Sequence, residues 1–181
     1  MDVELAQFLS RCQLLAEETA AWDNGRMPLG IAAYLCRELP PLDYVTSVRA
    51  IVLRDDSVLV VRDAENSYHI IPGGRREVGE TLEATLQREV LEETGWTINQ
   101  ISLLGFIHFR HLAPKPVDYA YPYPDFLQLV YAANAVNFNA DAKQLGQYEL
   151  ESGFRSIDEI NRLSIAASQQ AFLNAALKMK E

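Results

Sequence analysis

The sequence predicts one α/β domain in which helices pack on a mixed sheet. Three observations support this class. Segments rich in β-branched residues precede and follow an amphipathic helix at residues 82–94. A second helix, opened by a capping box, closes the chain. The length of 181 residues suits one domain with a sizeable core, and no repeat or long linker divides it.

The composition is 49% apolar and 23% charged, which is typical of a globular protein. The net charge of −9 argues against binding to nucleic acid or to anionic membranes, because no basic patch concentrates positive charge. No apolar run approaches the roughly 18 residues of a membrane span, and the acidic first residues do not resemble a secretory signal. Cys12 and Cys36 match no metal spacing and are expected to be reduced. We therefore expect a cytoplasmic protein.

The domain is expected to cover residues 1–181, with residues 1–41 as an extension of two helices. Apolar residues at helical spacing predict the first helix over residues 3–20, and the second is predicted over residues 28–37, before two prolines. The expected role of the extension is to pack on the common core as a cap on the sheet. A dimer contact and a lid are the alternatives.

The remaining chain is expected to alternate between strands and turns until a closing helix within residues 156–181. Ser156 and Glu159 form the capping box of that helix. Four prolines and three tyrosines between residues 111 and 125 predict a loop, which either packs on the sheet, closes over a site or stacks a nucleobase. The predicted strands lie at residues 44–54, 58–62, 68–71, 96–110 (one long or two short), 126–136 and 149–154.

Residues 82–94 carry the densest group of carboxylates at metal-binding spacing. On a helix, Glu89, Glu92 and Glu93 fall within about 100° of the circumference. Three like charges repel one another, and a divalent cation with oxygen ligands would offset that repulsion better than the single neighbouring Arg88. A solvated acidic helix face is the alternative interpretation.

Sequence signals outside the acidic face define both ends of this helix. Thr81 is the predicted N-cap and Gly95 the predicted left-handed C-terminal residue. Upstream, Gly73 and Gly74 predict a tight turn after a strand. The glycines would let backbone approach a metal, and the Gly73 carbonyl could complete its oxygen shell.

Residues 74–96 resemble the Nudix box of the Nudix hydrolase family. Its last nine residues read REVLEETGW, and the final bulky aliphatic of the family pattern is replaced by Trp96. Seven such identities at fixed spacing recur by chance about once in 10⁸ windows. The matching identities are Gly74, Glu80, Arg88, Glu89, Glu92, Glu93 and Gly95.

The resemblance implies an α/β/α sandwich and hydrolysis of a diphosphate linkage in a nucleoside diphosphate derivative, assisted by Mg²⁺ with Mn²⁺ as an alternative. Glu89, Glu92 and Glu93 would be metal ligands or, for one of them, the base that takes a proton from water. Arg88 would orient these glutamates, and Glu80 would be structural. The partner would be a small diphosphate molecule, and many relatives form homodimers.

Other residues are candidates by their place beside predicted strands and the box. Among later carboxylates, Glu151 is preferred to Asp125 and Glu149 as a further base or metal ligand, because related sequences often carry acids there. Phosphates need cations. The candidate phosphate-binding residues are Arg49, Arg62, Arg75, Arg76 and Arg110.

Two other functions remain open on the same fold. A non-catalytic nucleotide sensor would keep the pocket and lack turnover, and it usually comes with a further partner domain. An isomerase of isoprenoid diphosphates would carry a modified box, whereas this box is complete. Replacing Glu92 and Glu93 with Gln separates the enzyme from the sensor.

Overall fold

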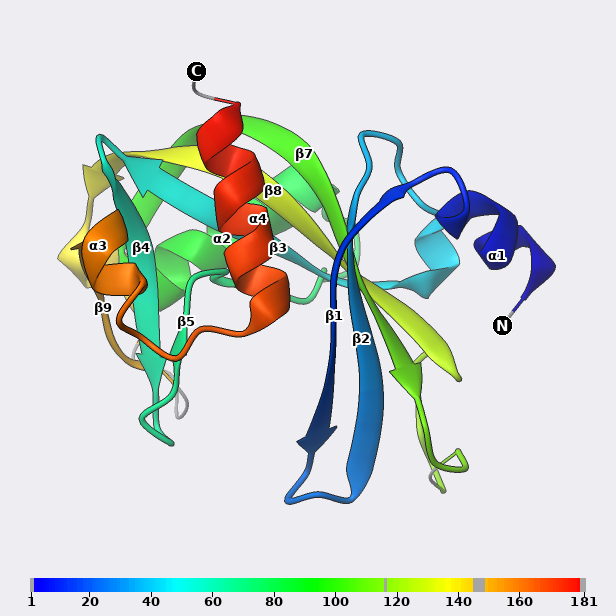
Figure 1. Ribbon diagram of the computed structural model, residues 1–181. Coiled ribbons are helices and arrows are strands. Elements are labelled where there is room, and N and C mark those ends of the chain that lie inside the picture. The colour runs from blue at the N-terminus through cyan, green and yellow to red at the C-terminus, as the bar shows by residue number, and fades with distance from the viewer. Residues whose placement is uncertain (1, 116, 145–148, 180–181) are drawn as a thin grey trace.

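The computed structural model describes residues 2–115, 117–144 and 149–179. Its strands form one mixed sheet in the order β1-β2-β7-β8-β3-β4-β5, with β6 paired to β3 and β9 paired to β4 (Figure 1). Only the β3–β8 pairing is parallel among the described strands. The strands are β1 (Gln13–Trp22), β2 (Met27–Leu35), β3 (Val45–Arg54), β4 (Ser57–Asp63), β5 (Tyr68–His69), β6 (Gly73–Gly74), β7 (Trp96–His111), β8 (Asp125–Phe138) and β9 (Glu149–Ser156).

Helices cover both faces of this sheet (Figure 1). Alternate residues of β3 point to opposite faces, so that Ile51 packs in the cluster beneath α4 and Val52 in the cluster beneath α2. Phe172 of α4 and Leu86 of α2 are fully buried in these two clusters. The predicted α/β sandwich with a mixed sheet is confirmed. The helices are α1 (Val3–Leu9), α2 (Leu82–Thr94), α3 (Ile157–Ile160) and α4 (Ala167–Lys178), with single 3₁₀ turns at Leu42–Tyr44 and Ala140–Ala142.

The predicted two-helix extension is wrong. Only α1 is helical, and β1 and β2 form an antiparallel hairpin that extends the sheet through β7. The residues Leu29, Ile31 and Ala33 alternate along β2 and are all buried, which is a strand pattern. Pairing on both sides of β2 overrides the helical preference of this Ala-, Leu- and Glu-rich segment. The extension is therefore part of the sheet rather than a cap on it.

The closing helix is also interrupted. Its capping box is confirmed, because the Ser156 side chain accepts from the Glu159 N–H while Glu159 accepts from the Ser156 N–H. The helix that follows ends at Ile160, and α4 begins only at Ala167. The N-terminus of α4 is capped by Glu18 of β1, which accepts from the backbone N–H of Ala167 at 3.1 Å. A cap about 150 residues away in the chain leaves no local signal for this break.

The predicted strands from residue 44 onward and the predicted loop agree with the structure. The segment after Gly95 is one long strand, β7, with register shifts where it pairs with β8. The described part of residues 112–124 contains no helix or strand, as expected for the proline- and tyrosine-rich loop. Within the described chain, each helix is too short or too polar to cross a membrane.

Candidate active site

The two ends of helix α2 and its buried apolar residues fix the direction of its acidic face. The Thr81 hydroxyl accepts from the Ala84 N–H at 3.1 Å, and Gly95 ends the helix with φ of 78°, so both predicted ends are confirmed. Leu86 and Val90 are fully buried against the sheet. Because these apolar residues set the rotation of the helix, the glutamates lie on its flank.

Arg88 is the centre of the polar network on that flank. Its Nε and Nη2 atoms donate to the two carboxylate oxygens of Glu80 at 2.7 and 3.0 Å. Its Nη1 atom donates to Glu89 at 3.0 Å and to Glu92 at 3.1 Å. Nη2 also donates to the Arg75 carbonyl at 3.1 Å. One guanidinium group therefore holds two of the three candidate glutamates and the loop before the helix.

The charges of this network stabilise one another. Hydrogen bonds from Arg88, from the Glu77 N–H and from Thr85 lower the pKa of Glu80 to about 2. The bonds to Glu80 and Glu89 raise the pKa of Arg88 above its already high value. Both groups are therefore ionised throughout the physiological range.

Two glycines bring the sheet close to the glutamates. The Gly73 N–H donates to a Glu93 carboxylate oxygen at 2.9 Å. Strand β6 pairs Gly73 with Arg49 of β3. A Cβ atom on Gly74 would lie 2.4 Å from the Glu89 carboxyl carbon, so the glutamate occupies the space that a side chain would need. Glu89 and Glu93 thus lie against the backbone of β6, which pairs with β3 at Arg49.

The donor set fits a hard divalent cation. Within the described residues, no three Asp, Glu, His or Cys side chains are gathered tightly enough to hold a metal ion in their present positions. Arg88 turns Glu89 and Glu92 toward itself, whereas Glu93 is turned toward Gly73. All three belong to one short stretch of helix, and carboxylate and carbonyl oxygens are the ligands that Mg²⁺ prefers. The side chains of these glutamates are the ones that would hold it.

Two neighbouring cavities open on the side of β3 that bears Arg49. The first, which we call the aromatic pocket, has a volume of about 240 Å³. The second, which we call the capped pocket because it contains the Glu18 cap of α4, has a volume of about 310 Å³. The aromatic pocket is lined by Trp22, Met27, Thr46, Ser47, Arg49, Arg75, Tyr119, Tyr121, Phe126 and Gln128. The capped pocket is lined by Glu18, Ala20, Trp22, Ile31, Arg49, His69, Ile71, Ile107, Phe109, Gln128, Ala166, Ser168 and Gln169.

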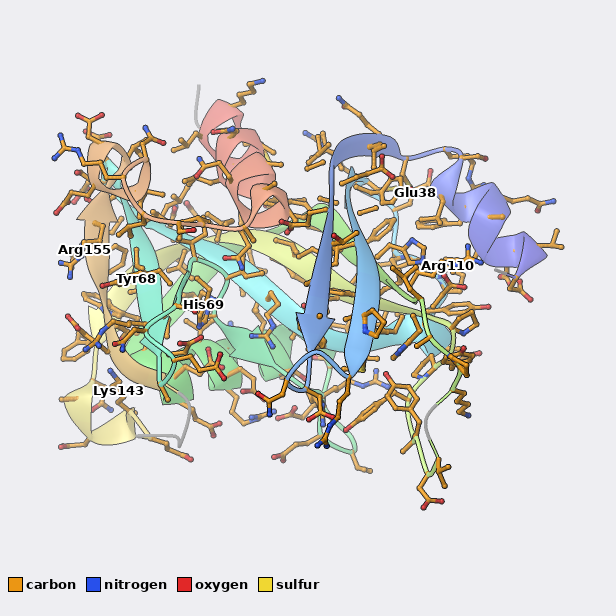
Figure 2. All side chains as sticks on the ribbon, turned by 60° about the horizontal axis from the view of Figure 1, so that its bottom comes forward. Glu38, Tyr68, His69, Arg110, Lys143 and Arg155 are labelled. Atoms are coloured by element: carbon orange, nitrogen blue, oxygen red, sulfur yellow. The ribbon has the colours of Figure 1, made fainter. Side chains whose placement is uncertain are left out.

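The structure brings only some of the predicted arginines to these cavities. Arg49 lines both, and Arg75 lines the aromatic pocket, where its guanidinium lies 4.4 Å from the centre of the Tyr121 ring and donates to the Tyr121 hydroxyl. Arg76 is exposed and lines a separate small cavity. Arg110 lies across the β1–β2 hairpin from His69 (Figure 2), beside another cavity that contains His108.

Arg62 and the predicted ligand Glu151 contact each other. Arg62 Nη2 lies 3.1 Å from a Glu151 carboxylate oxygen across the β4–β9 pair, and Arg155 lies 3.6 Å from the other oxygen. Asp125 is buried and lies 2.8 Å from His108 Nε2. These pairings give no support to Glu151 or Asp125 as metal ligands, and the side chain of Glu149 falls outside the described residues. The roles of Glu151, Arg62 and Arg110 stay predictions.

Several residues of the cavities were not found from the sequence. Trp22 and Gln128 line both cavities, whereas His69 and Gln169 line only the capped pocket. Trp22 ends β1, so recognising the hairpin would have placed its ring near the site. His69, Gln128 and Gln169 come from three different elements and have no shared spacing in the sequence.

The fold and the site define a class of proteins in which a helix rich in glutamates lies beside a glycine turn on a mixed sheet. Residues 43–174 match the sequence profile of the NUDIX domain. This match covers most of the chain, so the protein belongs to the Nudix family, and the resemblance seen in the sequence is confirmed.

Known relatives are similar over part of their length. An NAD-capped RNA hydrolase, NudC, of Enterobacter sp. (strain 638) is 31% identical over 134 residues, which cover 73% of this chain and 47% of the relative. The chain thus spans about half the length of the curated relatives it matches. A NUDIX hydrolase from Nitrosomonas europaea has 25% identity and a TM-score of 0.55 over 71% of this chain and 85% of its own. A pyrophosphohydrolase of Bacillus subtilis, with 18% identity, shares the fold with a TM-score of 0.57 over 90% of this chain and 96% of its own.

Proposed function

We propose that the protein hydrolyses a diphosphate linkage in a nucleoside diphosphate derivative and that it requires Mg²⁺, or Mn²⁺ in its place. The observation that carries this proposal is the contact of Glu93 with Gly73, whose strand partner Arg49 lines both cavities. A diphosphate that extends from Arg49 past Gly73 would reach the carboxylates on the α2 side of β3. The release of a nucleoside monophosphate or another phosphate ester would follow.

The position of each residue indicates the role that it would have. Glu89, Glu92 and Glu93 would hold the metal, and one of them would take the proton of the attacking water. The metal, when bound, supplies positive charge to the phosphate oxygens and acidifies water. Arg88 would keep Glu89 and Glu92 aimed, since it already bonds both. Arg49 and Arg75 would bind the anionic oxygens of the substrate.

The aromatic pocket supports a nucleotide as the substrate. Trp22, Tyr119 and Tyr121 offer flat rings for stacking with a base, and Arg49 and Arg75 supply the positive charge that a phosphate needs. Relatives are named NAD-capped RNA hydrolases, so NAD and NAD-capped RNA belong among the candidate substrates. The expectation of no nucleic-acid partner, the homodimer and the cytoplasmic location stay predictions.

The test is metal-dependent turnover against a panel of substrates. The panel contains nucleoside triphosphates, sugar nucleotides, dinucleoside polyphosphates, NAD and NAD-capped RNA. Each is assayed with Mg²⁺, with Mn²⁺ and with a chelator, and the products are separated by chromatography. Release of a nucleoside monophosphate that stops with the chelator is the expected result. No turnover on any substrate, with nucleotide binding present, would instead favour the non-catalytic sensor.

Matched variants separate catalysis from folding. Glu92→Gln and Glu93→Gln each keep the size of the side chain and remove its charge, and we expect turnover to fall by several orders of magnitude while the melting temperature changes little. The control is Glu83→Gln, an exposed carboxylate in the first turn of the same helix. Equal turnover in the Glu93→Gln and Glu83→Gln proteins would remove Glu93 from the proposed machinery.

A further inference from the structure

The two cavities differ in chemistry although they share a wall. Trp22, Arg49 and Gln128 line both of them. The aromatic pocket adds Arg75 and two tyrosines, which suit phosphate and a flat ring. The capped pocket adds Glu18, His69 and Gln169, so that Arg49 is its only cationic side chain among the residues that line it. A substrate centred on Arg49 would therefore place unlike groups on its two sides.

The charges of the capped pocket exclude a second anionic group. The Glu18 carboxylate accepts from the backbone N–H groups of Ala167 and Ser168 at the start of α4. Burial, followed by the nearby charge of Arg49, lowers the pKa of His69 to about 4, so its imidazole is neutral at physiological pH. A terminal phosphate in this pocket would meet Glu18 without a cation beyond Arg49 to balance it.

The same residues suit an uncharged group with hydroxyls. A neutral imidazole has one donor and one acceptor, and the amide of Gln169 has two donors on its nitrogen. The Gln169 Oε1 atom accepts from the Ile70 N–H at 2.9 Å, which fixes the amide at the edge of the pocket. The remaining lining includes Trp22, Ile71 and Phe109, which can pack against the C–H faces of a ring. Apolar faces and a hydroxyl edge together are the chemistry of a sugar.

We propose that the capped pocket binds the sugar of a nucleoside diphosphate sugar, on the side of the diphosphate opposite the nucleoside in the aromatic pocket. This inference rests on the proposed function and names its substrate class. The volume of about 310 Å³ lies at the lower end of the roughly 300–1,000 Å³ range of small-molecule pockets. Gln169 and His69 determine specificity, whereas the glutamates of α2 are common to every substrate.

The test compares two ligands that differ only in the sugar. One is a nucleoside diphosphate sugar and the other is the methyl ester of the same nucleoside diphosphate. For the wild-type protein we expect kcat/KM to be at least tenfold higher for the sugar nucleotide, because each hydrogen bond to a hydroxyl contributes up to about tenfold. Equal kcat/KM for the two ligands would overturn the inference, and so would a preference for NAD over the sugar nucleotide.

The variant Gln169→Glu isolates the donors of the amide. Its carboxylate can still accept from the Ile70 N–H, so the fold is expected to be kept, whereas both donors are lost. The new carboxylate also lies in the pocket with Glu18 and Arg49 and repels both ligands, so we expect kcat/KM to fall about tenfold more for the sugar nucleotide than for the methyl ester. The control is Gln170→Glu, which makes the same change one residue away and outside the residues that line the pocket. An equal fall for both ligands would contradict the assignment.

A binding experiment keeps this inference separate from the proposed function. In the Glu93→Gln protein with Mg²⁺, calorimetry with the same two ligands reports affinity without turnover. Tighter binding of the sugar nucleotide, reduced by Gln169→Glu, is expected even if hydrolysis is never observed. In that case the proposed hydrolysis would be wrong and the sugar pocket would stand. If both ligands were hydrolysed and bound with equal affinity, the proposed hydrolysis would stand and the sugar pocket would be wrong.

Discussion

The Arg88 guanidinium lies against the Glu80 carboxylate in a two-point contact, with Nε–Oε1 at 2.7 Å and Nη2–Oε2 at 3.0 Å. The third nitrogen, Nη1, is thereby aimed at Glu89 and Glu92. Glu80 comes from the loop before α2, so this contact also fixes how the loop meets the helix. We therefore expect Glu80 to act on the proposed site through Arg88, as a positioning residue.

Arg88→Lys is expected to lower kcat by about 10–100-fold while the protein still folds. A lysine keeps the positive charge, but its single ammonium group cannot contact Glu80 and two further glutamates in the fixed fork of a guanidinium. The measurement is steady-state turnover as a function of Mg²⁺ concentration, with circular dichroism to check folding. A lysine variant with wild-type turnover at every metal concentration would show that charge alone suffices.

The decrease in the stability of the fold at acid pH should depend on Glu80. Its pKa is about 2 in the folded protein, below the unfolded value of about 4.3. The carboxylate therefore contributes stability that is fully present above about pH 5 and is lost as the pH falls toward 2. In Glu80→Gln we expect a lower melting temperature at pH 7 and a smaller decrease between pH 5 and 3 than in the wild type. Parallel curves for the two proteins would contradict this linkage.

The two glycines of β6 should respond differently to alanine. At Gly73 the φ angle is 138°, and a Cβ would lie 2.2 Å from the Val48 carbonyl oxygen, so Gly73→Ala should destabilise the protein by roughly 1–3 kcal/mol or more. At Gly74 a Cβ would meet only the end of the Glu89 side chain, which can move. Gly74→Ala should therefore keep most of the stability and lower turnover at least tenfold. Urea unfolding and kinetics on both variants test this contrast, and the reverse ranking would refute it.

The sequence was sufficient for the parts of the site that local chemistry defines. Thr81, the alternation of apolar and acidic residues along α2 and Gly95 are local signals, and they predicted the helix, both its ends and its acidic face. The β1–β2 hairpin was mistaken for helices because its composition favours a helix and its pairing with β7 is a long-range contact. The alternation of Leu29, Ile31 and Ala33 was the one local signal of the strand.

The cavities could not be predicted from spacing. Trp22, Arg49, His69 and Gln169 lie on β1, β3, β5 and α4, and only the folded sheet and the helix packed on it bring them together. Arginines in or beside strands were reasonable candidates for phosphate binding. Which face of the sheet each arginine occupies, however, depends on the register of its strand. Arg49 and Arg110 show the difference, because both lie in strands and only the first reaches the cavities beside Gly73.

Glu18 is expected to stabilise the fold as a distant helix cap. It accepts from the backbone N–H groups of Ala167 and Ser168, each at 3.1 Å, so Glu18→Ala leaves two N–H groups of α4 without this acceptor. The expected loss is about 1 kcal/mol in the free energy of unfolding. Glu17→Ala is the control, since Glu17 is the exposed neighbour on the same strand. Urea unfolding measures both, and equal losses would mean that the cap contributes nothing of its own.

His69 should make the fold sensitive to mild acid. Burial and the charge of Arg49 lower its pKa from 6.5 to about 4, so the unfolded chain takes up a proton at a higher pH than the folded protein does. Stability is therefore lost as the pH falls from about 6.5 to 4, and because one pKa unit corresponds to about 1.4 kcal/mol, the full loss approaches about 3 kcal/mol.

His69→Gln removes the titrating group and keeps a polar side chain, so its free energy of unfolding should change less than that of the wild type over this range. Glu80 titrates mainly below this window, and the Glu80→Gln protein should keep the wild-type slope between pH 6.5 and 5. Identical pH profiles for the wild-type and His69→Gln proteins would show that the imidazole does not titrate on unfolding as the buried environment requires.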